Sequence, residues 1–513
     1  MASENLLQAI NRIFIALVMF AALCGIFLSV IMLFLPFLAE DDITFEIGEM
    51  EQNDNLALFA EVPATIAPDD SPYEFNTTIS TPSLTAPDTL SLYIYADGRR
   101  VAEIDCLKDF EYYEDYSNQT EFHCTALIPY NYLKSQDYKI FAVLMTEETE
   151  YTSQPIALSA DWSSYEGNFW SFSSLITILL VVFAVLLLPI TILAFYLTTR
   201  TKHAAAFKGE YSLGSLVFPL SNGKTILQKF HSFLLSPYFW FLEAIGIVIM
   251  LIYMAIAAEV WKSETALAAF VLSGLMAFII PYVWCIIWWY MDFREREPLR
   301  LIITLFLWGC LAALMAIGLN TILGAIFGIF GLGFISTFLL TPPTEEFYKG
   351  AGLGLISEHH EYDSIEDGIL FGFVIGMGFS FIEDWLYLLS NPMGSSIIGW
   401  FALFLMRAIL FSANHGFYTA IIGGLIGWLI ERRFPAPALG LLAGVPIAAF
   451  FHAMHNSGEM LISLLGAGGA ILYCCLLIPL FDYGGIIGLF ILFAYVLFRR
   501  RKKTGTKFRE KRS

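Results

Sequence analysis

Apolar runs long enough to cross a lipid bilayer recur along most of this 513-residue chain. A hydrocarbon layer about 30 Å thick needs about 20 apolar residues per helix, and residues 14–38 and 171–197 are the first two such runs. The chain is 57% hydrophobic and 15% charged, whereas soluble domains carry about 25% charged residues. The sequence therefore predicts a multi-pass α-helical protein of the cell membrane, with about 10–12 helices.

A hydrophilic stretch at residues 40–168 interrupts this pattern and holds roughly half of the acidic residues. Two of its segments, Leu90–Tyr95 and Tyr138–Leu144, are rich in β-branched and aromatic residues, and Asp97-Gly98 marks a turn after the first. Such segments are typical of a small antiparallel β-sandwich. Cys106 and Cys124 are the two cysteines of this stretch, and an oxidising exterior would allow a disulfide between them. We therefore expect an all-β, sandwich-like extracytoplasmic domain inserted between helices.

The predicted organisation has five parts. They are a signal anchor at 1–39, the acidic extracytoplasmic β-rich domain at 40–168, a second transmembrane helix with a cytoplasmic loop at 169–236, a polytopic core at 237–499 and a basic cytoplasmic tail at 500–513. The net charge of −19 hides the basic character of the end of the chain, from Arg499 onward. Positive-inside anchoring explains that tail better than nucleic-acid binding does, so no nucleic-acid partner is expected.

The core is almost continuously apolar. Its candidate helices cover 237–258, 267–290, 301–319, 321–341, 368–390, 397–430, 437–456, 460–480 and 484–499, with a shorter helix at 344–357. This count places the basic tail outside, against the charge rule that places it inside. We therefore expect one segment to be re-entrant, interfacial or miscounted, with 344–357 and the 460–499 pair as the candidates.

Ionisable side chains stand inside these apolar segments. A carboxylate at the centre of a bilayer costs roughly 2.5–3.5 kcal/mol on insertion scales. One such residue can be structural, paired with a cation of a neighbouring helix. Several together favour an active site among the membrane helices, and the candidates are Glu345, Glu346, Lys349, Glu383, Arg407, His415 and His452.

The spacing of these residues predicts which of them share a helix face. Two prolines precede Thr344, so Thr344 is expected to cap a helix whose first turn holds both glutamates, at the positive end of its dipole. Glu345 and Lys349 are four residues apart and should stack, so that Lys349 holds a neighbouring carboxylate ionised or shares its proton. His452 and Asn456 share the inward face of another helix by the same rule.

Two carboxylates and two histidines support two kinds of hydrolytic chemistry. Glu383, His415 and His452 can complete a His₂Glu set for a divalent metal such as Zn²⁺, while a further Glu acts as base. Alternatively, a Glu activates water without a metal, while His and Asn stabilise the oxyanion. The usual His-Glu-x-x-His motif of zinc proteases is absent from the sequence.

In order and spacing, four motifs of this chain resemble the PrsW family of intramembrane proteases, in the superfamily of the CAAX prenyl endopeptidases. The resemblance covers about residues 280–460, and Asp384 stands where the family usually has Asn. The anchor and the β-rich domain lie outside it. The four motifs are Glu345-Glu346-x-x-Lys349, Gly378-Phe379-x-x-x-Glu383-Asp384, His415-x-x-x-Thr419 and His452-x-x-x-Asn456.

The resemblance implies an intramembrane peptidase that cleaves membrane-spanning or membrane-proximal proteins, such as a single-span protein, in a signal-transduction role. Glu345 or Glu346 would be the general base, with Lys349 tuning the pair. Glu383, His415 and His452 would be metal ligands or proton and oxyanion partners, and Asn456 would orient the intermediate. The β-rich domain would recruit substrates or sense a signal.

Two other functions fit parts of the pattern. A proton- or cation-coupled transporter or channel would use the same acids and histidines as its path, but it predicts corresponding halves that the sequence does not show. A CAAX-type prenyl-protein endopeptidase is closer. It is disfavoured because Glu383 stands where those enzymes carry His, and because the first motif ends in Lys349 at four rather than Arg at five.

Overall fold

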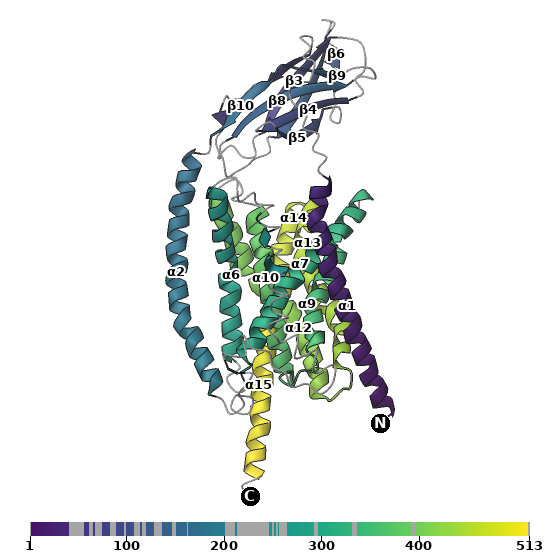
Figure 1. Cartoon of the computed structure of the whole chain (residues 1–513), viewed down its shortest axis with the longest axis vertical. Helices are drawn as coiled ribbons and strands as arrows, with labels where there is room; N and C mark the ends of the chain where they lie inside the picture. The colour runs from purple at the N-terminus through teal and green to yellow at the C-terminus, as the bar shows by residue number, and fades with distance from the viewer. Residues whose placement is uncertain are drawn as a thin grey trace.

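The computed structural model combines a helical bundle with a β-sandwich that stands beyond one end of it (Figure 1). It describes residues 2–39, 56–60, 65–66, 74–82, 89–96, 99–106, 113–114, 119–127, 136–145, 150–161, 163–200, 211–212, 246–248, 251–252, 255, 264–291, 296–330, 336–390 and 397–510. Eight helices in these residues are long and apolar enough to cross a membrane. The predicted multi-pass helical fold with an inserted β domain is confirmed.

The β domain is built from two sheets. One has the strand order β1-β3-β7-β6 and the other β2-β10-β8-β4-β5, with β9 paired to β8. Every pairing is antiparallel except the one between β2 and β10. The strands are β1 (Ala57–Ala60), β2 (Thr65–Ile66), β3 (Glu74–Pro82), β4 (Thr89–Ala96), β5 (Arg99–Asp105), β6 (Tyr113–Glu114), β7 (Gln119–Leu127), β8 (Gln136–Met145), β9 (Glu150–Thr152) and β10 (Ile156–Ala160).

Alternation along these strands explains the sandwich. Leu92 and Ile94 of β4 and Ile140 of β8 are fully buried, and they belong to the same core as Ile79 of β3 and Phe122 of β7 in the other sheet. Residues two apart on a strand face the same side, so these side chains form the faces that the two sheets pack together. The opposite face of β4 and β8 is buried as well, through a second apolar cluster of Tyr93, Tyr95, Phe141 and Val143. The predicted disulfide is present: Cys106, which follows β5, is bonded to Cys124 of β7 and ties the two sheets together.

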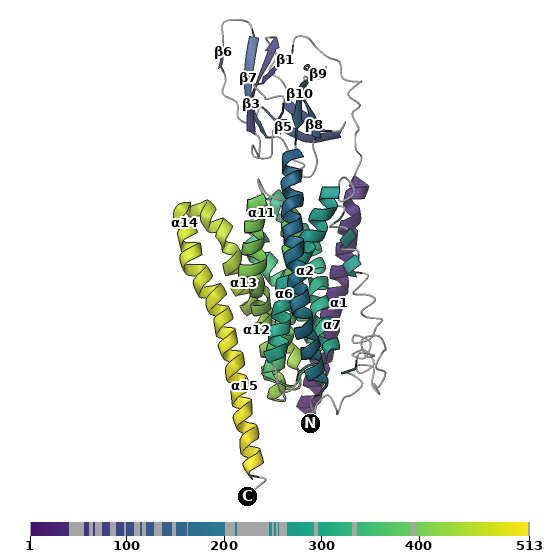
Figure 2. The ribbon, with the colours of Figure 1, turned by 90° about the vertical axis from the view of Figure 1, so that its left-hand side faces the viewer.

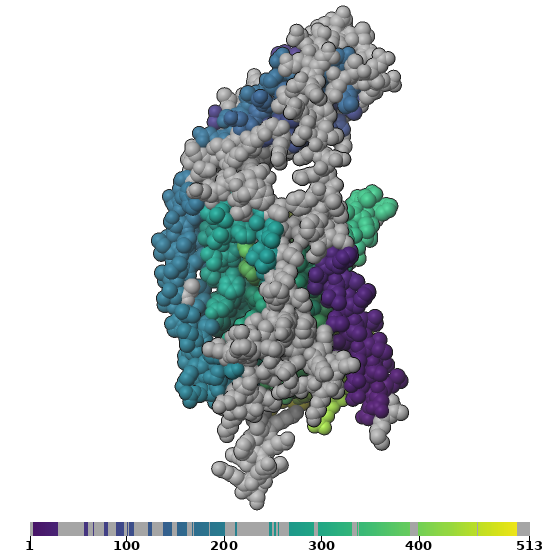
Figure 3. Space-filling view, viewed as in Figure 1, coloured from purple at the N-terminus to yellow at the C-terminus, as the bar shows by residue number. Residues whose placement is uncertain are grey.

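The helical part begins with two long helices that connect to the sandwich. They are α1 (Ala2–Ala39) and α2 (Ser163–Thr199), and they lie on opposite flanks of the bundle (Figure 3). The remaining helical elements are α6 (Glu264–Met291), α7 (Leu299–Ile329), η4 (Ser336–Leu340), α9 (Thr341–Leu355), α10 (Ile365–Ser390), α11 (Ile397–Phe404), η5 (Leu405–Leu410), α12 (Ser412–Glu431), η6 (Pro437–Leu439), α13 (Gly440–Leu465), α14 (Ala467–Leu472), η7 (Tyr473–Tyr483) and α15 (Gly484–Glu510).

Two helix boundaries differ from those expected. Residues 301–319 and 321–341 were expected to be separate helices, but α7 runs unbroken to Ile329. Residues 460–480 are not a separate helix either: α13 continues to Leu465, and 467–499 form one candidate span. The start of α1 and the end of α15 both lie on the side of the bundle away from the sandwich (Figures 1 and 2), as the charge rule requires of a basic tail on the same side as the N-terminus. The candidate helix 237–258 lies largely outside the described residues.

The centre of the bundle is α10, which packs against α6, α7 and α12. Its contact with α12 is especially close because glycines recur every four residues on one face of α10, at Gly368, Gly372 and Gly376. A Cβ atom at Gly376 would lie only 2.2 Å from the backbone oxygen of His415. Small residues four apart let membrane helices approach to backbone contact, and here they set α12 directly beside α10.

The helix expected to be a simple anchor is also part of the bundle. α1 packs against α7 and α9, and a Cβ at Gly25 would meet the ring of Tyr348 at 2.8 Å. Asn11, which is fully buried, donates to Glu358 at 2.8 Å and accepts from the backbone NH of Ala438 at 3.0 Å. By contrast, α2 presents exposed apolar side chains such as Val185 and Leu186, as expected of a helix that faces lipid.

Candidate active site

The two adjacent glutamates lie in the second turn of α9. The helix begins at Thr341, with the prolines in its first positions, where a missing NH costs nothing. The expected cap at Thr344 is therefore wrong. Its hydroxyl instead donates to the backbone oxygen of Leu340 at 2.8 Å, inside the helix. Glu345 and Glu346 then point in different directions from successive positions, and their surroundings differ.

Glu346 is completely buried in a network of donors. Its Oε1 accepts from Lys349 Nζ at 2.5 Å and lies 3.0 Å from His452 Nδ1. Its Oε2 accepts from the Thr419 hydroxyl at 3.3 Å. The expected stacking of Glu345 on Lys349 is thus replaced by a Glu346–Lys349 pair three residues apart, the other spacing that brings helical side chains together.

Lys349 also connects to the second histidine. Its Nζ lies 3.1 Å from His415 Nδ1 and 4.1 Å from the centroid of the Phe379 ring. Both lysine and carboxylate are fully buried. A buried charge is tolerated when it is paired and hydrogen-bonded, and this lysine meets both conditions.

One of the two carboxylate oxygens of Glu345 accepts a hydrogen bond from a described residue. Its Oε1 accepts from Asn320 Nδ2 of α7 at 3.2 Å. Its Oε2 is buried and has no hydrogen-bond donor among the described residues, while His452 Nε2 lies 3.7 Å away. A buried carboxylate oxygen without a donor, directed at a histidine nitrogen, is a position for a water molecule or a cation.

Glu383 forms a second group of charges on α10. Its Oε2 lies 2.5 Å from His415 Nε2, and its Oε1 accepts from Arg407 of η5 at 2.6 Å. The guanidinium also lies 3.7 Å from Asp384 Oδ1 and 3.6 Å from the centroid of the Tyr387 ring. Arg407, one of the ionisable residues found inside the apolar segments, is thus the partner of Glu383.

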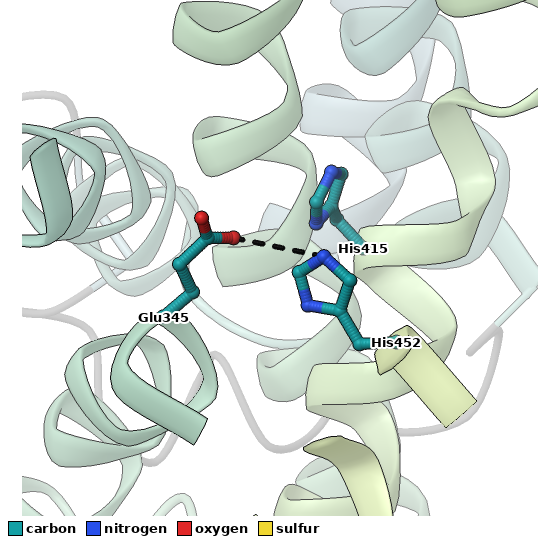
Figure 4. Close-up of side chains that lie close together, drawn as sticks. All are labelled: Glu345, His415 and His452. Carbon is teal, nitrogen blue, oxygen red and sulfur yellow. Dashed lines mark ion pairs between the residues drawn. The ribbon is translucent and has the colours of Figure 1, made fainter. Parts of the chain in front are cut away.

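Glu345, His415 and His452 form the group that could hold a metal ion. One ligand atom from each lies within 4.8 Å of the others, and Figure 4 shows the Glu345 carboxylate pointing toward His452, with His415 beside it. The expected set had Glu383 in place of Glu345. The donor types suit zinc, and Glu345 Oε2 and His452 Nε2 face each other. Both ring nitrogens of His415 have contacts, Nδ1 with Lys349 and Nε2 with Glu383. One of these contacts would be lost if that nitrogen bound a metal.

Six of the seven predicted site residues are therefore brought together: Glu345, Glu346, Lys349, Glu383, His415 and His452. Asn456 is the exception. It is partly buried one turn beyond His452, and no hydrogen bond joins it to the other six, all of which are described.

Other polar groups at the site were not predicted. Asn320 contacts Glu345, as described above. Asp482 of η7 is 1% exposed, accepts from the Tyr418 hydroxyl at 3.1 Å and lies 2.8 Å from His455 Nδ1. The Tyr418 ring stacks on that of His452, with 5.1 Å between centroids. A lone acid inside the apolar run 467–499 is the same signal that identified Glu345 and Glu383, and it could have found Asp482.

A cavity of about 230 Å³ opens beside this cluster, and both Glu345 and Glu383 line it. Carboxylates, imidazoles and a connected cavity together can bind and activate water and admit a substrate group. These are the elements that hydrolysis requires.

Comparison with known proteins agrees with this chemistry. Residues 297–500 match the model of the PrsW family of intramembrane metalloproteases. Protease PrsW of Geobacillus kaustophilus is 29% identical over 189 residues, which are 36% of this chain and 78% of that protein. Protease PrsW of Oceanobacillus iheyensis is 29% identical over 157 residues, 30% of this chain and 69% of that protein. No solved structure gives a significant match.

Proposed function

Since the chain belongs, through residues 297–500, to the PrsW family of intramembrane proteases, we propose that it hydrolyses a peptide bond of a membrane-embedded protein at the site around Glu345. The observation that carries this proposal is the buried Glu345 Oε2, which lacks a donor among the described residues and faces His452 beside the cavity. The comparisons give no support to the transporter or prenyl-endopeptidase alternatives.

In this proposal Glu345, His415 and His452 hold a divalent cation such as Zn²⁺. When bound, the cation supplies Lewis acidity that polarises a carbonyl and makes water more acidic. Each histidine has its own carboxylate: Glu346 for His452 and Glu383 for His415. Carboxylates in this position orient a metal-binding imidazole and raise its basicity.

The proton transfers fall to carboxylates that line the cavity. Glu345 would hold the cation and Glu346 is fully buried, so Glu383 takes the role of general base that was expected of one of those two. It removes a proton from the attacking water, and the resulting hydroxide adds to the scissile carbonyl carbon. The C–N bond then breaks, and the carboxylic acid returns the proton to the leaving nitrogen. Lys349 contacts Glu346 and His415, and its positive charge offsets part of the negative charge of the carboxylates in the cluster.

Replacing one carboxylate tests the proposal. Glu345→Gln keeps the size of the side chain and removes the charge that would hold the cation. We expect cleavage of a single-span reporter to fall by more than about 100-fold, because losing a group that only supports a metal ligand already costs about 10- to 100-fold. Glu431→Gln, at an exposed position at the end of α12, is the matched control and should cleave normally. Full activity of the inserted Glu345→Gln protein would refute the proposal.

Metal content is tested separately. The purified protein should contain a divalent metal, and His452→Ala should lower its metal content in elemental analysis. A chelator should abolish cleavage and Zn²⁺ should restore it. Cleavage that survives complete metal removal would instead assign water activation to Glu345 directly, with the histidines as oxyanion partners.

We further propose that the sandwich is extracytoplasmic and the Arg499 tail cytoplasmic. The disulfide requires an oxidising compartment, and the basic tail favours the inside. Recruitment of substrates by the sandwich, and a role in signal transduction, remain predictions from its position in the chain.

A further inference from the structure

The cavity beside Glu345 lies between α7 and α10 and is mostly apolar. Residues of α7 line one side and residues of α10 line the other. The carboxylates of Glu345, from α9, and Glu383, from α10, also line the cavity. Its lining residues are Ala313, Ala316, Ile317, Glu345, Phe379, Glu383, Leu386 and Tyr387.

The size of the cavity limits what it can hold. Its volume is about 230 Å³, below the roughly 300–1,000 Å³ of sites for drug-sized ligands. An α-helix with its side chains is about 10–12 Å across, far too wide for this space. The cavity therefore accommodates a side chain and a short piece of extended backbone, but not a folded transmembrane helix.

The shape of the cavity depends on two small residues. Ala313 and Ala316 are 2% and 1% exposed, and any larger side chain at either position would extend into the cavity. Leu386 lines it from α10, and Tyr387, which is 43% exposed, lies where the cavity meets the surface. Side chains of both α7 and α10 therefore limit the size of the cavity.

We propose that this cavity binds the side chain of a medium-sized or large apolar substrate residue next to the scissile bond, and that Ala316 sets the size it accepts. The inference rests on the proposed peptidase function and deepens it. A peptide carbonyl inside a helix is already hydrogen-bonded to its own backbone, so a substrate must be extended where it is cut. The favoured substrates are membrane segments that unwind locally around such a residue.

Two opposite changes of cavity size test this proposal. Ala316→Leu shortens the cavity and Leu386→Ala widens it. Each is assayed in the full-length protein against paired single-span reporters that carry Leu or Ala beside the cleavage site. One methylene in an apolar pocket changes specificity by about 10- to 200-fold. We therefore expect Ala316→Leu to reduce cleavage of the Leu reporter at least tenfold relative to the Ala reporter. Leu386→Ala is also assayed against a third reporter that carries Phe, and it should cleave this reporter better, relative to the Leu reporter, than wild type does.

The control is Ala443→Leu, the same substitution at an exposed position of α13, which should leave the ratio between reporters unchanged. If both variants alter the two reporters equally while wild type cleaves and Glu345→Gln does not, the cavity proposal fails and the peptidase function stands. If wild type and Glu345→Gln are equally inactive on every reporter, both proposals fail.

Discussion

Glu346 and Lys349 form an ion pair inside the membrane part of the protein. Both are completely buried, and His452, Thr419 and His415 complete their hydrogen bonds. The attraction within such a pair only offsets the cost of removing two charges from water. The pair is therefore better understood as a support that orients both histidines than as a source of stability.

Replacing one member of the Glu346–Lys349 pair should destabilise the protein more than replacing both members. Lys349→Met leaves the buried Glu346 carboxylate without its cation, so we expect the inserted protein to lose about 3–5 kcal/mol of stability. The double variant Lys349→Met/Glu346→Gln should regain most of that loss. Unfolding in detergent, followed by circular dichroism, measures both. Arg432→Met, at an exposed position, serves as the control, and a single variant as stable as the double one would contradict this account.

The residues of the site were predictable, but their pairings were not. Each ionisable group stood out because apolar neighbours surround it. Spacing alone could not decide between Glu345 and Glu346 as the partner of Lys349, because residues three and four apart are both neighbours on a helix. In the structure, His452 of α13 lies 3.0 Å from Glu346 Oε1, the same oxygen that accepts from Lys349. A contact from a different helix thus accompanies the Glu346–Lys349 pairing. The same limit applies to the metal group, in which Glu345 replaces Glu383 because Arg407 occupies the latter.

At the scale of elements, the position of His415 depends on how closely α10 and α12 approach. The glycine triplet of α10 faces backbone atoms of α12, and Gly376 is the member opposite His415 itself. The two helices therefore have no intervening side chain at this point, and any added atom must move one of them.

Substituting this glycine should reduce activity without touching a catalytic group. Gly376→Val would push the His415 backbone away, since even its Cβ would lie 2.2 Å from the oxygen. A displacement of about 1 Å can cost about 100-fold in rate, and we expect a loss of that order in the reporter assay. Gly488→Val is the control, because a Cβ there meets no atom within 4 Å. Equal activities of the two variants would rule out this role for the contact.

The type of each element was easier to predict than its ends. Apolar length gave the helices and alternation gave the strands. Asn320, at the junction where two helices were expected, instead lies inside α7 and donates to Glu345. A polar residue in an apolar run can thus mark either a break or a partner for another buried group, and only the packed structure distinguishes the two.

At the scale of the whole molecule, the sandwich differs from the helical part in being cross-linked by a disulfide. The bond closes a loop whose ends are 18 residues apart. Cross-linking a loop of this length stabilises a fold by about 3 kcal/mol, mainly by restricting the unfolded chain.

Removing the disulfide should therefore loosen the sandwich. In Cys106→Ser/Cys124→Ser we expect a stability loss of about 3 kcal/mol, which is about 100-fold more of the open form. Limited proteolysis of the full-length protein should cut the sandwich correspondingly faster. Cys474→Ser/Cys475→Ser, which changes two exposed free cysteines of η7, is the control and should be cut at the wild-type rate. Identical rates for both variants would show that the bond contributes nothing.

Asn11 has a consequence for how the protein is made. Its two partners lie 347 and 427 residues further along the chain, so the ribosome must add 427 residues after Asn11 before the second one exists. At about 5–20 residues per second, that takes roughly 20–85 seconds. During this interval the first helix to enter the membrane carries an amide that the finished fold buries, and its final docking waits for one of the last segments to emerge.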